Sequence, residues 1–495
     1  MSNNENTRRL LGPFNRVEGD LEVKVDISAG QVTEAWVNAP LYRGFETILA
    51  GKDPRDALVY TPRICGICSV SQSVASSRAI AAAQGLAATA NGRLATNIIL
   101  ACENLADHLS HFYLFFMPDF AREVYNDQPW YNDIRQRFQA QRGAASLDVL
   151  PQRAEFMKLT GILAGKWPHS LALQPGGTTR AIDSREKLRL QGLIMGFRRF
   201  LENTVFGDKL ENIQNLTSID ALLAWRDSHQ HSDFGRFLML ADSLQLDQLG
   251  RAGDNFMSYG AYHLDEQISD DINQDTHAFK PGLWCNDQLE TLDPSLITED
   301  ISHAWMRAQR EPKHPSQGTT MPDENANGAY TWCKAPRYNK RVVEVGALAR
   351  QVIDGHPLIR ALVAESGGNV QNRIIARLLE LARVLPLMEV WNKELKLGES
   401  FCESANIPRE TQGMGLVEAA RGSLGHWLDV RNGLILNYQI IAPTTWNFSP
   451  RDENNIPGAL ERALVGTPVD RNGQESVAIQ HIVRSFDPCM VCTVH

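Results

Sequence analysis

Apolar residues recur every three or four positions between residues 91 and 120, in the segment NGRLATNIILACENLADHLSHFYLFFMPDF. This spacing places them on one face of an α-helix. The opposite face is also largely apolar, and a helix that is apolar on both faces lies inside a bundle rather than on its surface. The pattern therefore predicts a long helix deep within a helical bundle.

Other segments show weaker helical patterns. The run SVSQSVASSRAIAAAQG is rich in small residues and ends in Gly85, a typical helix stop. Further helices are predicted at about residues 183–205, 234–247, 343–353, 369–398 and 475–485. Pro386 lies inside the fourth of these, where its missing N–H predicts a kink.

Strand-like patterns are short. Residues alternate between polar and apolar from Leu21 to Val37, around the turn SAGQ, which predicts an antiparallel hairpin. The run NGLILNYQIIAP predicts another strand near the C-terminus. Loops are predicted at residues 310–329 and, less clearly, in the acidic and Asn-rich region 265–300. The expected fold class is mainly α with small antiparallel sheets (α+β), dominated by a large bundle of long helices.

The chain has 495 residues, without an internal repeat or a linker that would divide it. We therefore expect one large domain spanning residues 1–495. Within it, the hairpin covers about residues 10–40 and the helical bundle about residues 65–400. A C-terminal segment of about residues 414–495 ends in a cysteine pair and is expected to bind metal.

Composition excludes some classes of partner. Hydrophobic residues make up 43% of the chain and charged residues 22%, with a net charge of −9, which argues against a general nucleic-acid or anionic-membrane surface. No apolar run approaches the roughly 20 residues that span a bilayer. The first residues, MSNNENTRRLLGPFNRVEGD, lack the apolar core of a secretory signal. We expect a cytoplasmic protein with no direct membrane span.

The candidate chemistry lies in two CxxC pairs near opposite ends of the chain, Cys65 with Cys68 in RICGIC and Cys489 with Cys492 in DPCMVC. This spacing lets both sulfurs of a pair face one point, and a following helix favours the thiolate. Four thiolates suit a soft metal such as zinc, an iron–sulfur cluster or nickel. A structural zinc site and a disulfide remain alternatives, although zinc modules usually keep their pairs within a few tens of residues. The other four cysteines are expected to be small buried residues.

The two cysteine motifs together resemble those of the large subunit of [NiFe] hydrogenases. Other blocks are similar to that family in the same order: FNRVEGDLEV, LYRGFE, DPRDAL, DHLSHFY, WPHSLALQPGGTT, TWCKAPRYNKRVVEVGALAR, ARGSLGHW and PTTWNFSPRD. The resemblance implies the large-subunit fold and the heterolytic cleavage of H2 to protons and electrons. It also implies a NiFe(CN)2(CO) centre and a partner, a small subunit that carries Fe–S clusters. No further cysteine cluster with iron–sulfur spacing is found in this chain to carry the electrons.

The resemblance assigns roles to the four cysteines. Cys65 and Cys489 would be terminal nickel ligands, whereas Cys68 and Cys492 would bridge nickel to iron. A thiolate sulfur keeps several lone pairs, so it can bridge two metals.

Four charged residues would act beside the centre. By resemblance, Glu18 would relay protons, and a partly desolvated carboxyl near thiolates has a raised pKa suited to that task. Arg421 would hang over the open position between the metals, with its guanidinium fixed by Asp107 and Asp487.

Further positions match residues that contact the diatomic ligands or a second metal. Pro443 and Thr444 match residues that line the cyanides, and Ala420 stands where a proline is common. Magnesium would be held by three residues near the C-terminus, which are Glu46, the carbonyl of Ile440 and the imidazole of His495. By contrast, His108 and His111 are expected to be hydrogen-bonded core histidines.

Besides Ala420, three residues depart from the common family pattern. Gln72 replaces a histidine, so it can donate a hydrogen bond but cannot titrate. Ile67 and Phe115 are larger than the usual gas-tunnel residues, and a narrower constriction would slow O2 more than H2. These three departures, together with an end at His495 without a further tail, resemble the regulatory, hydrogen-sensing subgroup. That subgroup reports to a histidine kinase.

Two alternatives are a slow, oxygen-tolerant uptake hydrogenase that feeds respiration and, in another class, a non-catalytic zinc or structural homologue. Four intact cysteines argue against the second alternative.

Overall fold

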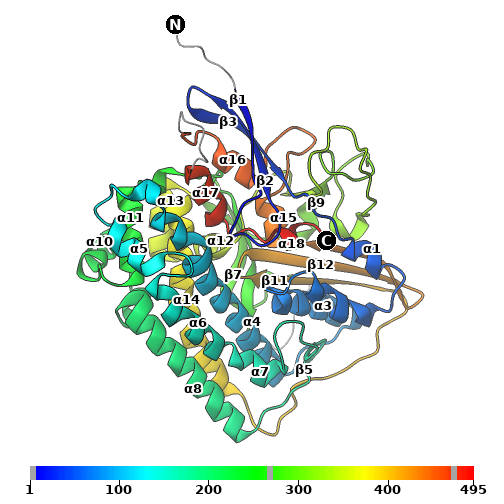
Figure 1. The fold of residues 1–495 in the computed structure, drawn as a ribbon. Coiled ribbons are helices and arrows are strands. Elements are labelled where there is room, and N and C mark those ends of the chain that lie inside the picture. The colour runs from blue at the N-terminus through cyan, green and yellow to red at the C-terminus, as the bar shows by residue number, and fades with distance from the viewer. Residues whose placement is uncertain (1–6, 265–270, 470–476) are drawn as a thin grey trace.

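Two long helices form the centre of the molecule in the computed structural model, which describes residues 7–264, 271–469 and 477–495. α4 (Ala90–Ser110) continues into a π-helical turn at His111–Phe116, and α14 (Val370–Glu394) packs along it (Figure 1). Nearly every residue of α4 is buried. The predicted central helix is therefore confirmed, and α14 continues past Pro386.

The other helices are shorter, and several of them, such as α1 and α16, lie beside the sheets (Figure 1). They are α1 (Phe45–Leu49), α2 (Ala57–Tyr60), α3 (Ser69–Gln84), α5 (Tyr131–Phe138), α6 (Ala144–Phe156), α7 (Lys158–Ala164), α8 (Ser184–Phe200), α9 (Leu210–Gln214), α10 (Ile219–Ser228), α11 (Asp233–Ser243), α12 (Ala347–Asp354), α13 (Pro357–Ser366), α15 (Pro443–Asn447), α16 (Ala459–Leu464), α17 (Val477–Ser485) and α18 (Met490–Thr493). Among them α3, α8, α11, α12 and α17 confirm the predicted helices, and Gly85 ends α3 in the left-handed region at φ 62°. No helix within the described parts of the chain is both long and apolar enough to cross a membrane.

The strands form small antiparallel sheets. The predicted hairpin is confirmed as β2 (Glu22–Ser28) and β3 (Gln31–Asn38), to which β1 (Thr7–Leu11) adds a third strand. The other sheets are β4–β5 (Leu173–Gln174, Gly177–Thr178), β6–β7–β8 (Phe256–His263, His277–Cys285, Gln288–Glu290), β9–β10 (Ile297–Asp300, Ala335–Tyr338) and β11–β12–β13 (Thr411–Ala419, Gly422–Arg431, Leu434–Ile441). The fold class is therefore the expected one, mainly α with small antiparallel sheets.

The prediction of a loop at residues 265–300 is wrong where β7, β8 and β9 lie. The region is polar in composition, so the apolar face of β7 was not recognised in the sequence. In β7, Phe279, Leu283 and Cys285 are buried, and the strand packs against α12. Residues 265–270 of the predicted loop lie outside the described residues. The predicted polar loop at 310–329 is confirmed, with one 3-10 turn at Pro315–Gln317.

Helix α3 is held closely against β11 and β12, and this contact positions its N-terminus. Two glycines of β11 permit the approach. A Cβ at Gly413 would lie 2.0 Å from the carbonyl oxygen of Ala79, and one at Gly415 would lie 2.0 Å from that of Ala75. The helix that follows Cys68 is therefore fixed against the C-terminal sheet.

Candidate metal centre

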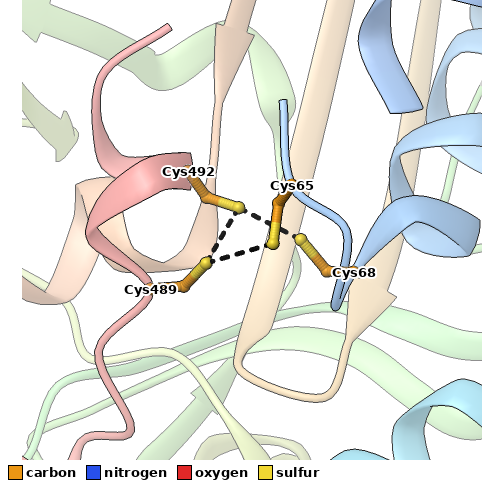
Figure 2. Close-up of side chains that lie close together, drawn as sticks. All are labelled: Cys65, Cys68, Cys489 and Cys492. Atoms are coloured by element: carbon orange, nitrogen blue, oxygen red, sulfur yellow. Dashed lines mark hydrogen bonds between the residues drawn. The ribbon is translucent and has the colours of Figure 1, made fainter. Parts of the chain in front are cut away.

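The four cysteines of the two CxxC motifs meet inside the molecule (Figure 2). Cys65 and Cys68 come from the loop before α3, and Cys489 and Cys492 from the start of α18. The Sγ–Sγ distances are 3.5 Å from Cys65 to Cys489, 3.1 Å from Cys68 to Cys492 and 3.1 Å from Cys489 to Cys492. A disulfide needs about 2.05 Å, and all four cysteines are free, so the disulfide alternative is wrong.

The sulfurs are also close for a zinc site. A regular tetrahedron with zinc–sulfur bonds of about 2.3 Å separates its sulfurs by about 3.8 Å, which is longer than each of the three short distances. Protonation is uneven across the cluster. Hydrogen bonds from Cys489, Cys492 and Cys68 hold the pKa of Cys65 well below its usual value, while contact with the other thiols raises the pKa of Cys68 well above it. Four thiolates together therefore require compensating positive charge.

Arg421 supplies a fixed cation beside the sulfurs. Its Nη1 lies 2.7 Å from Oδ2 of Asp107 and its Nη2 lies 3.1 Å from Oδ1 of Asp487, while Nε donates to the Asp487 carbonyl at 2.9 Å. Burial raises the pKa of Asp107 to about 7, although the charge of Arg421 opposes that rise. Burial is the largest influence on the pKa of Asp487 and acts to raise it, but Arg421 and its basic neighbours His111 and Arg377 together outweigh burial, so the pKa is lowered. The structure thus brings together the three residues that the sequence grouped.

A cavity of about 10 Å³ lies against the sulfurs, about the space of one water molecule. Its lining residues are Cys68, Gln72, Ala419, Ala420, Arg421, Leu424, Pro443, Thr444, Cys489 and Cys492. Thr444 accepts a hydrogen bond from the Cys489 amide at 3.2 Å through its hydroxyl oxygen, so its own proton remains available to another acceptor. The two residues predicted to line the cyanides, Pro443 and Thr444, line this cavity together with Gln72 and Ala420, whereas neither Ile67 nor Phe115 is part of the lining.

The side chain of Gln72 belongs to a buried chain of hydrogen bonds that sequence reasoning missed. Its Oε1 lies 2.8 Å from Nε2 of His426, and Nδ1 of His426 lies 2.8 Å from the hydroxyl of Tyr438. Because an amide oxygen only accepts, Nε2 of His426 carries the proton and the Tyr438 hydroxyl donates to Nδ1. Burial lowers the pKa of His426 well below its usual value, so the ring is neutral. The only signal in the sequence was the histidine of ARGSLGHW.

Glu18 is joined to the second cysteine pair through its backbone. It forms a parallel bridge with Cys489, accepts a hydrogen bond from the Met490 amide at 2.6 Å and donates to the Pro488 carbonyl at 3.3 Å. Its side chain is half-buried. Burial and the charge of Cys65 raise the pKa of Glu18, against the effect of Arg421.

Another buried carboxylate, Glu103, supports the first pair and was also missed. Its oxygens accept from the amides of Val70 and Ser71 at 2.8 and 2.9 Å, within the first turn of α3. These bonds hold the helix whose N-cap is Cys68. Burial raises the pKa of Glu103 to about 7 despite the hydrogen bonds. A second carboxylate beside Asp107 in the predicted buried helix was the available signal.

Glu46, Ile440 and His495 also lie together. Oε1 of Glu46 accepts from the Ile440 amide at 2.8 Å and lies 3.7 Å from Nε2 of His495, which itself contacts the Ile440 carbonyl. The Lys334 ammonium lies 3.2 Å from Oε2 of Glu46 and 3.4 Å from Oε2 of Glu299. The three predicted magnesium ligands are adjacent, and magnesium itself remains a prediction.

The two helical histidines are core residues. His108 is buried 3.3 Å from Glu380, and His111 is hydrogen-bonded to the Arg484 carbonyl at 2.6 Å. Burial lowers the pKa of both. Neither belongs to the cysteine cluster. Both are core residues, as predicted, and the predicted hydrogen bond is confirmed for His111, whereas His108 lies only within ion-pair distance of Glu380.

Comparison with known proteins identifies the family. The model of the nickel-dependent hydrogenase family matches residues 43–128 and 123–495. The periplasmic [NiFeSe] hydrogenase large subunit of Desulfomicrobium baculatum is 28% identical, with 98% of this chain and 94% of that protein covered. The hydrogenase-2 large chain of Escherichia coli is also 28% identical, with 99% and 97% covered.

A solved structure supports the same family assignment. The Ni-Fe-Se hydrogenase of D. vulgaris Hildenborough in its as-isolated oxidised state superposes with a TM-score of 0.84 at 28% identity, over 99% of this chain and 100% of that one. The fold, the four gathered sulfurs and the family match lead to one conclusion: this chain belongs to the nickel-dependent hydrogenase family, as a catalytic large subunit.

Proposed function

We propose that this chain cleaves H2 heterolytically into protons and electrons and that it acts as a hydrogen sensor. The observation that carries the proposal is the small cavity lined by Cys68, Cys489, Cys492 and Arg421. Three soft donors and a fixed cation around a space of this size fit a metal-bound diatomic molecule better than an organic substrate.

The residues present fit a nickel–iron group with cyanide and carbonyl ligands. Cys65, Cys68, Cys489 and Cys492 would hold the metals, and such a group supplies the redox chemistry that cleaves dihydrogen. Arg421 keeps its positive charge at every physiological pH and directs it into the cavity, which favours negative charge that develops there. The Thr444 hydroxyl can donate to a cyanide nitrogen, and Pro443 and Ala420 exclude water.

Protons would leave through Glu18. Its backbone bonds to Pro488 and Met490 fix it beside Cys489, and its half-buried side chain connects that position with the exterior. A carboxyl group with a raised pKa exchanges protons near neutral pH. We also propose that magnesium, a hard cation, is held by Glu46, the Ile440 carbonyl and His495. Water bound to this ion would extend the proton path.

Electrons require a partner. Within the described residues, the cysteines gather into a cluster at the two CxxC pairs alone. We therefore propose that a small subunit with Fe–S clusters receives the electrons, as expected for a chain whose relatives are called large subunits. We also propose that the chain forms a single domain and that it is cytoplasmic. A histidine kinase would receive the hydrogen signal.

The sensor role is supported by residues beside the centre. Gln72 is held by neutral His426 and contributes an amide that cannot titrate. Ile67 lies between Cys65 and Cys68, and Phe115 lies in the π-helical turn after α4. The uptake alternative also has support, because one relative at 27% identity is the uptake hydrogenase large subunit of Rhizobium leguminosarum bv. viciae. A histidine kinase gene beside this gene would favour sensing, and genes for electron carriers or a membrane anchor would favour uptake.

Infrared spectroscopy with elemental analysis tests the centre. The purified complex should contain nickel and iron in equal amounts and show two cyanide bands and one carbonyl band that change under H2. Stoichiometric zinc without these bands would instead support the structural homologue and end the proposal.

The effect of oxygen on H2 oxidation tests the proposed sensor role. The double substitution Ile67→Val with Phe115→Leu should make H2 oxidation more sensitive to air, because a wider constriction admits O2. Ile48→Val, on the exposed surface, is the matched control. Equal activity in air for the double variant and the control would contradict the gas-tunnel argument while leaving the metal centre intact.

A further inference from the structure

A second cluster of metal-ligating side chains lies on the hairpin of β6 and β7, outside the cysteine centre. His263 ends β6 and His277 begins β7, and the two are direct partners in the antiparallel register. Directly opposite residues keep their Cβ atoms within about 5.5 Å and extend their side chains from the same face of the sheet. The two imidazole rings are accordingly 5.2 Å apart between centroids.

Asp275 completes the group, two residues before His277. Its Oδ2 lies 3.5 Å from Nε2 of His263, and one ligand atom from each of the three residues lies within 4.8 Å of the others. A tetrahedral ion with bonds of about 2.05 Å to nitrogen and oxygen separates its ligands by about 3.4 Å. The distance from His263 to Asp275 is close to that length, and the other two ligand–ligand distances do not exceed 4.8 Å.

The histidine orientation also suits a metal. Nδ1 of His277 lies 3.2 Å from the carbonyl oxygen of Asp275 and donates to it, which leaves the lone pair on Nε2. Ligating histidines typically donate their other ring N–H to a carbonyl or carboxylate in this way. The position of β6 is fixed as well, because the His263 carbonyl accepts from Nδ2 of Asn97 in α4 at 2.9 Å.

Space for additional ligands is present beside the three side chains. A cavity of about 580 Å³ is lined by His263, Asp275 and His277, and also by Arg78. The guanidinium of Arg78 donates to the Leu416 carbonyl at 2.7 Å. Its positive charge favours water or a small anion as the remaining ligand and disfavours another positively charged side chain there.

We propose that His263, Asp275 and His277 bind one divalent transition-metal ion of the zinc and cobalt class, with its remaining positions open to this cavity. Two imidazoles and one carboxylate favour such an ion over magnesium or calcium, which prefer oxygen ligands. This hairpin site is separate from the cysteine centre. Arg78 lies ten residues beyond Cys68 along α3, or about 15 Å of helix.

Cobalt(II) is the probe, because the nickel–iron centre contains none and its visible absorption reports the coordination. Tag-free holoenzyme with its nickel and iron bound should take up one equivalent of Co²⁺, and Zn²⁺ should displace it. His277→Ala should weaken this binding by more than the roughly 100-fold that a change outside the ligand shell costs. His231→Ala removes an exposed histidine elsewhere and should leave the binding unchanged.

Nickel and iron content and H2 oxidation report whether each variant is folded, because none of the three residues belongs to the cysteine centre. Asp275→Asn, which keeps the shape of the side chain, is the second variant if His277→Ala does not fold. Absence of saturable Co²⁺ binding to the holoenzyme would overturn the proposal, as would equal binding by wild type and the folded ligand variants. Neither result bears on the hydrogenase function, which the infrared bands test separately.

Discussion

The cysteine centre and the hairpin site differ in how far along the chain their ligands lie. Cys65 and Cys489 are 424 residues apart, whereas His263 and His277 are register partners in one hairpin. Loop closure costs about (3/2)RT ln n, so bringing the cysteines together costs about 3 kcal/mol more than joining the hairpin. The cysteine centre therefore depends on the completed fold, while the hairpin site depends on the pairing of two neighbouring strands.

Specific contacts offset the larger cost of the cysteine centre. The bridge from Glu18 to Cys489 holds the C-terminal pair, and Glu103 holds the helix that follows Cys68. Arg421 joins Asp107 of α4 to Asp487 beside the C-terminal pair. None of these contacts involves the hairpin of β6 and β7, so changes at this centre should affect nickel and iron without affecting the hairpin site.

The largest effect is expected for Cys492→Ser. Serine keeps the size of the side chain but removes a soft ligand, so the variant should contain no nickel–iron centre and should not exchange deuterium with protons. Elemental analysis checks the metals, and Co²⁺ binding at the hairpin site should be unchanged. Cys402→Ser, at a half-exposed cysteine outside the cluster, is the control. A Cys492→Ser protein that retained both metals would show that this sulfur is not a ligand.

Arg421→Lys should have the next largest effect. Lysine keeps the charge but loses the fork that spans Asp107 and Asp487, so the cation is no longer fixed at the cavity. Losing a preorganised donor of this kind typically costs about 100- to 1,000-fold in turnover. H2 oxidation rates, with nickel and iron content as the check, measure it. Arg55→Lys, at an exposed ion pair, controls for the substitution, and equal rates for the two variants would contradict the assigned role.

The two sites also show what the sequence could and could not predict. CxxC pairs in their family context indicated the cysteine centre, because spacing of two between thiols is uncommon outside metal and redox sites. The hairpin site was missed since acidic and polar residues made 265–300 resemble a loop. Strand register is a tertiary property, and without it His263 and His277 are two unrelated histidines.

Long-range side-chain contacts were beyond prediction for the same reason. Gln72 was identified as a departure from the family pattern, but its partner His426 lies 354 residues away. Helices were predicted more successfully, because the apolar period in α4 and the stop at Gly85 are local signals. The sequence therefore predicted the central helices and the ligand types, whereas the supporting hydrogen bonds required the structure.

Glu18→Gln should separate proton transfer from metal binding. Glutamine preserves the backbone bonds to Pro488 and Met490 but cannot carry a proton, so H2 oxidation should fall by about 100-fold. The metal content and the cyanide and carbonyl bands should stay as in the wild type. Glu34→Gln, at an exposed glutamate, serves as the control. Unchanged oxidation in the Glu18 variant would mean that protons leave by another route.

Tyr438→Phe should have the smallest effect, and it tests how far support for the cysteine centre extends. The substitution removes the hydroxyl that donates to His426 and leaves the buried Nδ1 without a partner, which costs about 1 to 3 kcal/mol. The thermal midpoint should fall, while His426 continues to donate to Gln72 and both metals stay bound. Tyr42→Phe, at an exposed hydroxyl that contacts Thr47, should change the midpoint less. If Tyr438→Phe instead lost nickel and iron, the centre would depend on this hydrogen-bond chain as strongly as on its sulfurs.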